Sequence, residues 1–213
     1  MCIRDRNDKA LITWYENEVK KAGLDIRFNT EINDLGILRG YDEIIVATGA
    51  VPRKMLIPGF EKCLTFTQLL REKYPVGDKV VFFGGGQSAC EAAYEMVLQG
   101  KHPVIVEYAK DLVPAQNVCL SNASFLRDVL EYHKVPTYLE HTIREIKDKT
   151  VVIASKDGKN VFEVEYDNIV NGIGFVPAPV GGKGKNIHRV GDCVTIGNLR
   201  TAIWRAWDVC MKI

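Results

Sequence analysis

Three small residues that follow a short apolar run have the spacing of a dinucleotide-binding turn. Gly84, Gly86 and Ala89 match the pattern G-x-G-x-x-G/A directly after residues 79–83. The first glycine of such a pattern permits a tight turn, the second lets backbone approach a pyrophosphate, and the third small residue lets a helix pack closely on the strand. The N–H groups and the positive dipole at the start of that helix then attract the phosphates.

The residues around this turn agree with the same interpretation. Residues 79–83, rich in Val and Phe, suit a buried strand, residues 89–97 carry an apolar helical stripe that Gly100 ends, and residues 103–107 suit a second strand. Glu107 ends that strand near the position, roughly 20 residues on, of the acid that holds the adenosine ribose. An acid repels the extra phosphate of NADPH, and 108–111 contain no Arg, so NADH is favoured. A plain glycine turn is the alternative.

Composition excludes several classes of function. The 28 basic and 27 acidic residues give a net charge of +1, which offers no electrostatic case for nucleic acid or for an anionic membrane. The longest apolar runs are as short as strands, so none is expected to span a bilayer. The charged start of the chain does not resemble a secretory signal, and the six cysteines form no C-x-x-C or zinc pattern. We expect a cytoplasmic protein with reduced thiols and no metal site.

The order of the remaining elements predicts an α/β fold in which one unit interrupts another. We expect helices at 8–22, 63–73, 121–133 and 203–211, strands at 24–28, 41–47, 136–139, 167–172 and 187–190, and an antiparallel hairpin from 151–154 and 161–164. Residues 76–175 form one continuous unit in this scheme, and the segments on either side belong to a second. Such a plan requires residues near Ala47 and Asp192 to meet in space.

Three motifs in a fixed order resemble a known family. They are ATGAVP at 47–52, GGGQSACEAA at 84–93 and VGDC at 190–193. This order resembles the two-dinucleotide flavoprotein reductases, and in particular the C-terminal half of the 2,4-dienoyl-CoA reductase and enoate reductase group related to Old Yellow Enzyme. The resemblance implies a Rossmann-like NAD(P)-binding domain, residues 76–178, inserted into an incomplete FAD-binding domain formed by residues 1–75 and 179–213.

The resemblance also implies which residues bind the cofactors. Backbone at a crossover passes close to FAD, a Gly-Asp pair holds its ribityl-pyrophosphate part, and a later residue starts the helix that points at the isoalloxazine. The NAD site comprises the glycine turn, the ribose acid, a residue near the nicotinamide and a groove-lining glycine segment. For FAD, the crossover is Ala47, Thr48 and Gly49, the Gly-Asp pair is Gly191 and Asp192, and Ala202 starts the helix. For NAD, the glycine turn is Gly84, Gly86, Gln87 and Ala89, the ribose acid is Glu107, the residue near the nicotinamide is Glu91, and the groove segment contains Gly172 and Gly174.

The chain departs from the family pattern in ways that predict a fragment. An FAD fingerprint ahead of residue 8 is missing, as are the flavin-binding barrel and the iron–sulfur cysteines of full-length relatives. FMN and a 4Fe-4S cluster would therefore belong to a missing N-terminal part, with that barrel domain as partner. Residues 1–6 carry no recognisable element and we suspect that they are not native. No cysteine pair stands where disulfide reductases keep theirs.

The predicted activity is that of an NAD(P)H-dependent flavin oxidoreductase. Hydride would pass from NADH to FAD, with no catalytic side chain assigned, and would feed an enoate or 2,4-dienoyl-CoA reductase site in the full-length protein. A stand-alone NADH oxidase or ferredoxin-type reductase is the alternative enzyme. A non-catalytic NAD-binding remnant is the alternative of another class.

Overall fold

The chain consists of two compact units, one of which interrupts the other. The computed structural model describes residues 6–114 and 118–213. Lys54–Gly174, together with the N-terminal stretch up to Glu16, make the first unit, and Asn17–Arg53 with Phe175–Ile213 make the second. One unit is thus inserted into the other, with boundaries at 53/54 and 174/175, and the domain boundaries at 75/76 and 178/179 remain predictions from the sequence.

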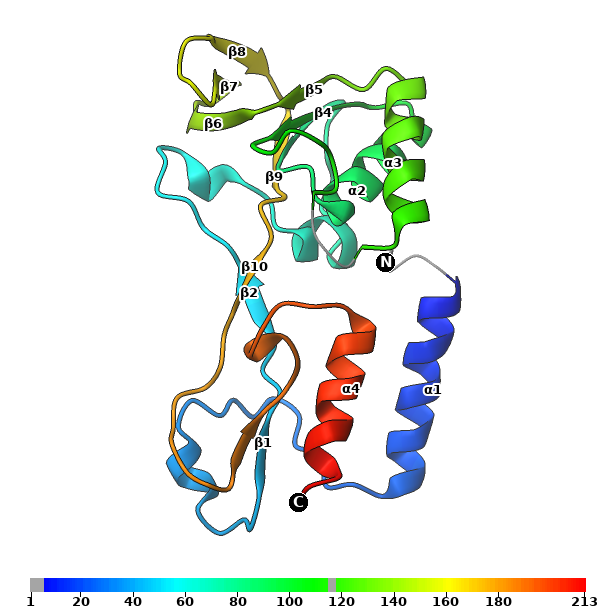
Figure 1. Cartoon of the computed structure of the whole chain (residues 1–213), viewed down its shortest axis with the longest axis vertical. Coiled ribbons are helices and arrows are strands. Elements are labelled where there is room, and N and C mark those ends of the chain that lie inside the picture. The colour runs from blue at the N-terminus through cyan, green and yellow to red at the C-terminus, as the bar shows by residue number, and fades with distance from the viewer. Residues whose placement is uncertain (1–5, 115–117) are drawn as a thin grey trace. The chain divides into compact units, whose positions relative to one another are not determined.

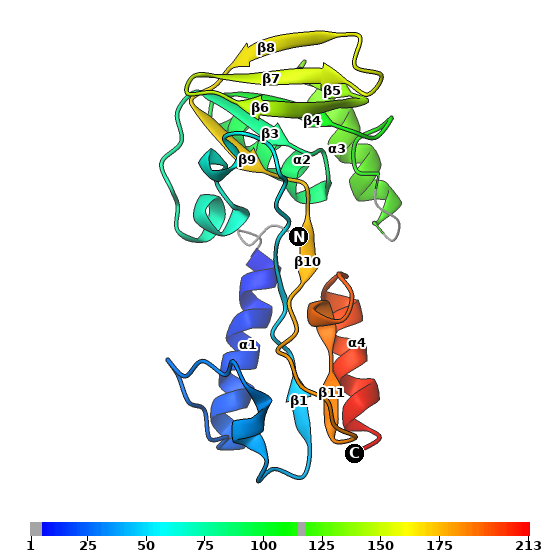
Figure 2. The same ribbon diagram turned by 90° about the vertical axis from the view of Figure 1, so that its left-hand side faces the viewer.

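A four-stranded parallel sheet organises the first unit. Its strands are β3 (Lys79–Phe83), β4 (His102–Glu107), β5 (Thr137–Leu139) and β9 (Asn168–Asn171), in the order β5-β4-β3-β9. Figures 1 and 2 show helices α2 (Gln87–Leu98) and α3 (Leu120–Tyr132) on one face of it and the strands β6, β7 and β8 on the other. These strands, α2 and most of α3 match the sequence prediction.

Coverage of both faces explains why β3 is almost wholly apolar. Val80 and Phe82 face the core shared with α2 and α3, while Val81 and Phe83 face the core shared with the second sheet. All four side chains are buried. A parallel strand that is buried on both faces reads as a continuous hydrophobic run and shows no alternation.

The second sheet of this unit is antiparallel and has three strands. β7 (Thr150–Ser155) and β8 (Val161–Glu165) form the predicted hairpin around Asp157 and Gly158. β6 (His141–Ile146), which we did not predict, pairs with β7 through a register shift between Ile143 and Glu145. Such a shift breaks the strict alternation by which a strand is recognised in sequence.

The second unit is smaller and has two pairs of strands. β1 (Ile44–Val46) pairs in parallel with β11 (Ile187–Arg189), and β2 (Ala50–Pro52) pairs antiparallel with β10 (Phe175–Pro177). The core of the unit gathers around Leu35, Ile44, Val46 and Cys193. Short helical turns at Leu35–Leu38 and Gly191–Cys193 and helix α4 (Leu199–Cys210) complete it. Helix α1 (Arg6–Ala22) contributes its last residues, from Asn17 on, to this unit.

Several predicted elements are wrong or shifted. Residues 24–28 form no strand, because no neighbouring strand among the described residues pairs with them, and Leu24, Ile26 and Phe28 stay exposed. Within the predicted helix at 63–73 the structure has only a π-helical turn at Thr67–Arg71, and a 3₁₀ turn at Phe60–Lys62 precedes this range. Helix α3 is capped at Cys119, two residues before the expected Ser121, and α4 starts at Leu199, four residues before the expected 203.

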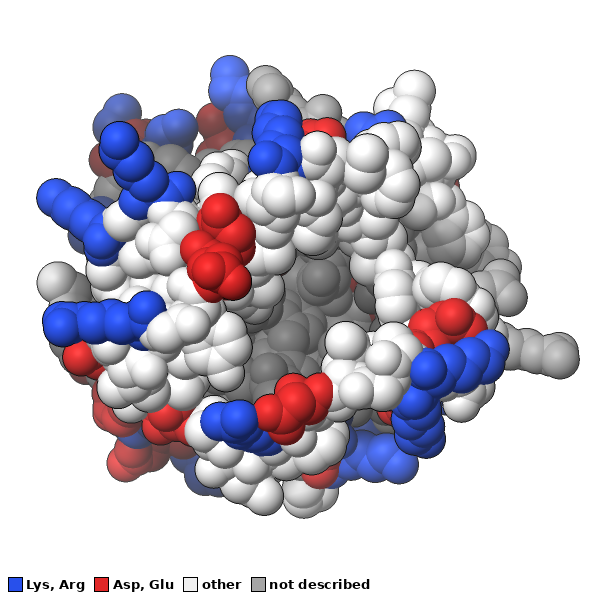
Figure 3. All heavy atoms as spheres, turned by 90° about the horizontal axis from the view of Figure 1, so that it is seen from below, with Lys and Arg blue, Asp and Glu red and all other residues white. Residues whose placement is uncertain are grey.

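The surface shows no concentration of one charge on the face drawn in Figure 3. Basic and acidic side chains lie close to one another on this face. This mixture agrees with the near-zero net charge of the sequence. None of the helices among the described residues is long and apolar enough to cross a membrane.

Candidate dinucleotide site

The glycine turn between β3 and α2 requires glycine at its first position. Phe83 ends the strand and Gln87 begins the helix, so that Gly84, Gly85 and Gly86 make the whole turn. Gly84 has a φ of +109°, and a Cβ there would lie 2.5 Å from the carbonyl oxygen of Gly172. Any side chain would therefore be both strained and in collision with backbone.

Gly86 differs from Gly84 because the space in front of it is open. Its φ is −69°, and a Cβ built on it would meet no heavy atom within 4 Å. Gly86 is the N-cap of α2 and offers no side-chain cap, and the first amide bonded inside the helix is that of Cys90, to the Gly86 carbonyl at 3.0 Å. Within the described residues, the amides of Gln87 and Ser88 have no acceptor, so donors and space for an anion coincide.

Small residues bring the end of β9 against the start of α2. Ala89 is 1% exposed, and a Cβ on Gly172 would lie 3.2 Å from the Cβ of Ala89. The Gly172 amide donates to the Phe83 carbonyl at 2.8 Å. The third position of the glycine pattern therefore performs the close helix packing expected of it, and it does so against the predicted groove segment. Gly174, at the end of that segment, has a φ of +92°.

Glu107 is placed beside the glycine turn, as the sequence predicted. It ends β4, is 9% exposed, and its Oε2 accepts the Gly85 amide at 2.6 Å while Oε1 accepts the Ala109 amide at 2.7 Å. An ionised carboxylate has about four acceptor positions, so both oxygens can still accept ribose hydroxyls. Gln87 and Glu91, one turn apart on α2, hydrogen-bond to each other at 2.8 Å.

A loop that sequence reasoning missed fixes the central glycine from the other side. The Val113 amide donates to the Gly85 carbonyl at 2.8 Å, and Leu112 packs against Gly85. Val113 has a φ of +50°, which is a rare and strained conformation for a β-branched residue. Arg127 on α3 holds the Leu112 carbonyl through Nη2 at 2.8 Å. No local sequence signal links residues so far apart in the chain.

The predicted flavin-side residues lie together at one end of the β1–β11 pair in the second unit. Val46 and Arg189 are paired at the carboxyl ends of these two parallel strands, and the Val190 amide donates to the Val46 carbonyl at 3.0 Å. Residues 47–49 and 190–192 therefore leave the pair at the same end, where ligands bind in parallel α/β sheets. Thr48 Oγ1 donates to the Ala178 carbonyl at 2.7 Å, and Gly49 has a φ of +71°.

Asp192 and Ala202 are close to the positions that the family pattern implies, with one correction. Asp192 Oδ1 accepts the Gly197 amide at 3.0 Å. A Cβ on Gly191, at φ +67°, would lie 4.0 Å from the Cβ of Ala202. Ala202 does not start α4: the N-cap is Asn198, whose carbonyl accepts the Ala202 amide at 3.0 Å, so Ala202 lies at the end of the first turn.

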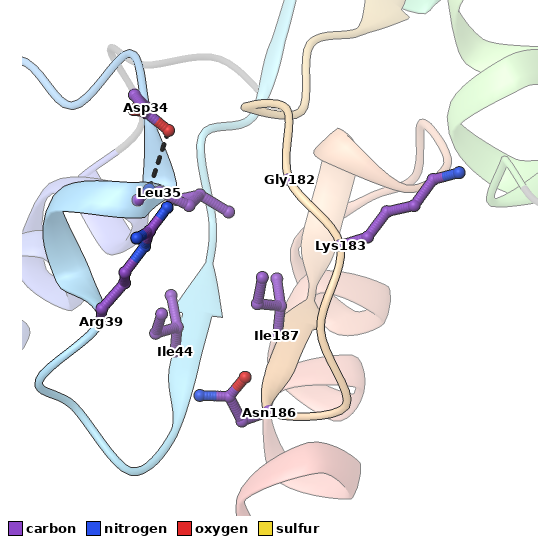
Figure 4. A pocket seen from close by; sticks show the side chains of 9 residues that line it. Asp34, Leu35, Arg39, Ile44, Gly182, Lys183, Asn186 and Ile187 are labelled. Atoms are coloured by element: carbon purple, nitrogen blue, oxygen red, sulfur yellow. Dashed lines mark hydrogen bonds between the residues drawn. The ribbon is translucent and has the colours of Figure 1, made fainter.

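A cavity in the second unit lies at the opposite end of the same strands. It measures about 380 Å³, and Ile44 and Ile187, the first residues of β1 and β11, line it. Figure 4 shows Arg39 on the turn next to these strands, while the side chain of Lys183 points away from the other labelled residues. Because the cavity lies at the amino ends of the strands, it is separate from the predicted flavin residues at their carboxyl ends.

The buried cysteines have packing and hydrogen-bonding roles. Burial raises the pKa of the Cys90 thiol from 9.0 to about 12, and its Sγ donates to the Gly85 carbonyl. Burial also raises the pKa of Cys63 to about 12. Cys193 Sγ donates to the Val46 and Val190 carbonyls, so it links the two strand ends. Every cysteine of the described part is a free thiol.

A family model matches most of the chain. Residues 38–210 match the pyridine nucleotide-disulphide oxidoreductases. The chain belongs to this family. Its members are enzymes with a fold that binds FAD and a nicotinamide nucleotide, which confirms the predicted fold class.

Individual relatives confirm the resemblance to the enoate and dienoyl-CoA reductase group. The chain is 30% identical to the cinnamate reductase of Clostridium sporogenes over 214 aligned positions, which cover 97% of this chain and 32% of that protein. A solved structure of a 2-naphthoyl-CoA reductase matches with a TM-score of 0.80 and 27% identity, over 95% of this chain and 32% of the other. The chain thus spans about a third of the length of these relatives.

More distant relatives share parts of the chain or only the fold. The terpredoxin reductase of a Pseudomonas species is 27% identical over 148 positions, which cover 64% of this chain and 35% of that protein. A thioredoxin reductase of T. acidophilum shares the fold, with a TM-score of 0.61 at 16% identity.

The residues of the first unit fit a nicotinamide nucleotide. Such a ligand uses three features of this unit. They are the open space at Gly86, the α2 amides that have no acceptor among the described residues, and the buried acid at the end of β4. The second unit fits part of a flavin nucleotide. It presents Asp192 and the ends of β1 and β11, while a second glycine fingerprint, which would hold the flavin pyrophosphate, is not in the sequence.

Proposed function

We propose that this chain is a hydride-transfer module that takes electrons from NAD(P)H, with NADH favoured, and delivers them to FAD. The observation that carries the proposal is the hydrogen bond of 2.6 Å from the Gly85 amide to Glu107 Oε2. It supports the proposal because a dinucleotide site needs an acid for the ribose close to the turn that receives the phosphates. A plain glycine turn needs no buried acid at this position. Family membership supports the flavin part.

Each group of residues has its own task in this proposal. The bound nucleotides supply the redox chemistry, and no side-chain acid or base is required. Gly84 and Gly86 shape the turn, the α2 amides hold the pyrophosphate, and Glu107 orients the adenosine ribose. In the second unit, Asp192 would accept a hydroxyl of the flavin chain, and the amides at the start of α4 would favour negative charge on the bound flavin.

The electrons leave for a part of the protein that this sequence does not include. Because the relatives are about three times longer, we propose that a barrel domain carrying FMN and a 4Fe-4S cluster receives them and reduces an activated alkene of the enoate or 2,4-dienoyl-CoA type. Two of the relatives are a cinnamate reductase and a 2-naphthoyl-CoA reductase, and their names support a conjugated acyl substrate for the full-length protein.

Visible absorbance under anaerobic conditions tests the module. The purified chain is mixed with FAD, and the spectrum is recorded before and after addition of NADH. We expect a bound-flavin spectrum that bleaches with NADH. Free-flavin absorbance that NADH does not change would contradict the proposal of a competent module. Binding of NADH without bleaching would instead favour the non-catalytic NAD-binding alternative.

A further inference from the structure

Three successive hydrogen bonds connect the Glu107 side chain to the turn between β7 and β8. The Ala109 amide donates to Glu107 Oε1 at 2.7 Å, the Glu140 amide donates to the Ala109 carbonyl at 3.0 Å, and the Lys156 amide donates to the Glu140 carbonyl at 2.7 Å. Glu140 has a φ of +55°, a strained conformation for a residue with a side chain. The turn is therefore held in fixed register beside the ribose acid.

This register places a positive charge next to the strand end that carries the acid. Lys156 Nζ lies 4.5 Å from the centroid of the Tyr108 ring, and Tyr108 directly follows Glu107. Tyr108 is 56% exposed, so the ring and the ammonium group lie at the surface of the candidate adenosine site. A cation above an aromatic face is held by the ring quadrupole, which limits where this long side chain can move.

The charge of Lys156 is available to a ligand. Among the described residues it forms no ion pair, whereas Lys159, in the same turn, lies 3.7 Å from Asp157. An ammonium group that forms no ion pair can bind a phosphate on the neighbouring ribose, because no existing ion pair has to be broken first. The absence of Arg from residues 108–111 therefore does not leave the site without a cation.

We propose that Lys156 is a specificity residue that lets this site accept the 2′-phosphate of NADPH in spite of Glu107. The inference rests on the proposed function, because it assumes that the glycine turn binds a nicotinamide nucleotide. Glu107 favours the free ribose hydroxyls, and Lys156 offsets its repulsion of the 2′-phosphate. The site then binds NADH moderately more tightly than NADPH and accepts both nucleotides.

Calorimetric titration with two small probes separates the phosphate contact from the rest of the site. Adenosine 2′,5′-bisphosphate carries the 2′-phosphate and 5′-AMP does not. We expect Lys156→Met, which keeps the aliphatic stem over Tyr108, to weaken binding of the bisphosphate roughly fivefold, as for about one exposed ion pair. Binding of 5′-AMP is expected to stay within about twofold, and Lys156→Arg to restore the bisphosphate affinity.

Two lysine variants serve as controls, and NADH binding by the native chain tests the proposed function separately. Lys159→Met removes the same charge from the same turn, Lys110→Met removes the lysine nearest to Tyr108 in sequence, and both are expected to leave the ratio of the two affinities unchanged. Equal weakening of both probes by Lys156→Met, no weakening, or an effect confined to Lys110→Met would each overturn the inference. Failure of the native chain to bind NADH in a fluorescence titration would overturn the proposed function together with it.

Discussion

Two glycines of one motif serve different purposes, and the structure separates them. Gly84 is required by the fold, because its φ of +109° and the nearby Gly172 carbonyl admit no side chain. Gly86 is compatible with a side chain in the folded protein, because nothing lies within 4 Å of its would-be Cβ. A ligand bound in that space would explain why the position requires glycine.

Alanine substitutions at these two positions are expected to affect different properties of the protein. Gly84→Ala is predicted to lower the free energy of unfolding by about 2 kcal/mol or more, as a strained residue and a backbone collision combine. Gly86→Ala is predicted to leave stability within about 0.5 kcal/mol while weakening NADH binding at least about tenfold. Denaturant unfolding and NADH fluorescence titration measure the two quantities. Full NADH affinity in Gly86→Ala would place the pyrophosphate elsewhere.

Glu107 contributes both to structure and to nucleotide choice. Glu107→Gln keeps an acceptor for the Gly85 amide and removes the charge, so we expect a modest change in stability and a lower preference for NADH over NADPH. Glu107→Ala is expected to erode the preference too, and to loosen the turn. Dissociation constants for both nucleotides test this. An unchanged ratio in both variants would mean that Glu107 does not read the ribose.

At the scale of single elements, helix α4 depends on a capping box that determines where it begins. The Asn198 side chain accepts the Thr201 amide at 3.1 Å, and Thr201 Oγ1 accepts the Asn198 amide at 2.8 Å. This reciprocal pair satisfies two amides that would otherwise lack partners. It also explains why Ala202, whose amide bonds back to Asn198, lies inside the helix and does not start it.

Removal of this cap is expected to destabilise the second unit. Asn198→Ala is predicted to cost about 1 kcal/mol, the usual effect of losing an N-cap side chain, while Asn198→Asp is expected to retain most of the stability. Thermal unfolding followed by far-UV circular dichroism is suitable, because loss of the twelve-residue helix α4 lowers the helical signal. Identical unfolding of the alanine variant and the native chain would contradict a role of the cap.

At the scale of the whole molecule, the two units differ in the amount of apolar core that they contain. Two large clusters fill the first unit, one on each face of its parallel sheet. The second unit has four buried hydrophobic residues in its core cluster, and one face of β1 leaves Ile45 exposed. Since hydrophobic burial is the main favourable contribution to folding, most of the stability resides in the first unit.

One buried thiol, Cys90, and one partly buried thiol, Cys63, give the stability of the first unit a predicted dependence on alkaline pH. The pKa of Cys63 and Cys90 is raised from 9.0 to about 12 by burial, so the folded state retains protons that the unfolded chain releases. This stabilising contribution is complete below pH 9.0 and is lost as pH rises toward 12. Each pH unit in that window costs about 1.4 kcal/mol per thiol.

Denaturant unfolding at about pH 8, 9 and 10 measures this loss, with Cys90→Ala as the control. The variant is expected to be less stable at neutral pH, because the buried thiol leaves a small cavity, and to lose less stability per pH unit than the native chain. Parallel pH profiles of the two proteins would show that Cys90 does not titrate as the structure requires.

The sequence by itself determined the features that depend on neighbours in the chain. The spacing of Gly84, Gly86 and Ala89 predicted a strand, a turn and a helix, and Glu107 was predicted to end the next strand, because a βα turn and its following strand are local units. The order of the three motifs predicted the inserted fold and the family. Val46 and Val190 meet as that plan requires.

Only the tertiary structure decided the features that join distant segments. Val113 fixes Gly85 from a strained conformation, and Lys156 reaches Tyr108 from another sheet, and neither pairing has a periodic signal in the sequence. The predicted strand at 24–28 is absent for the same reason. Alternating apolar residues make a segment suited to a sheet, but a strand forms only where a neighbour supplies its hydrogen bonds, and that neighbour is a property of the fold.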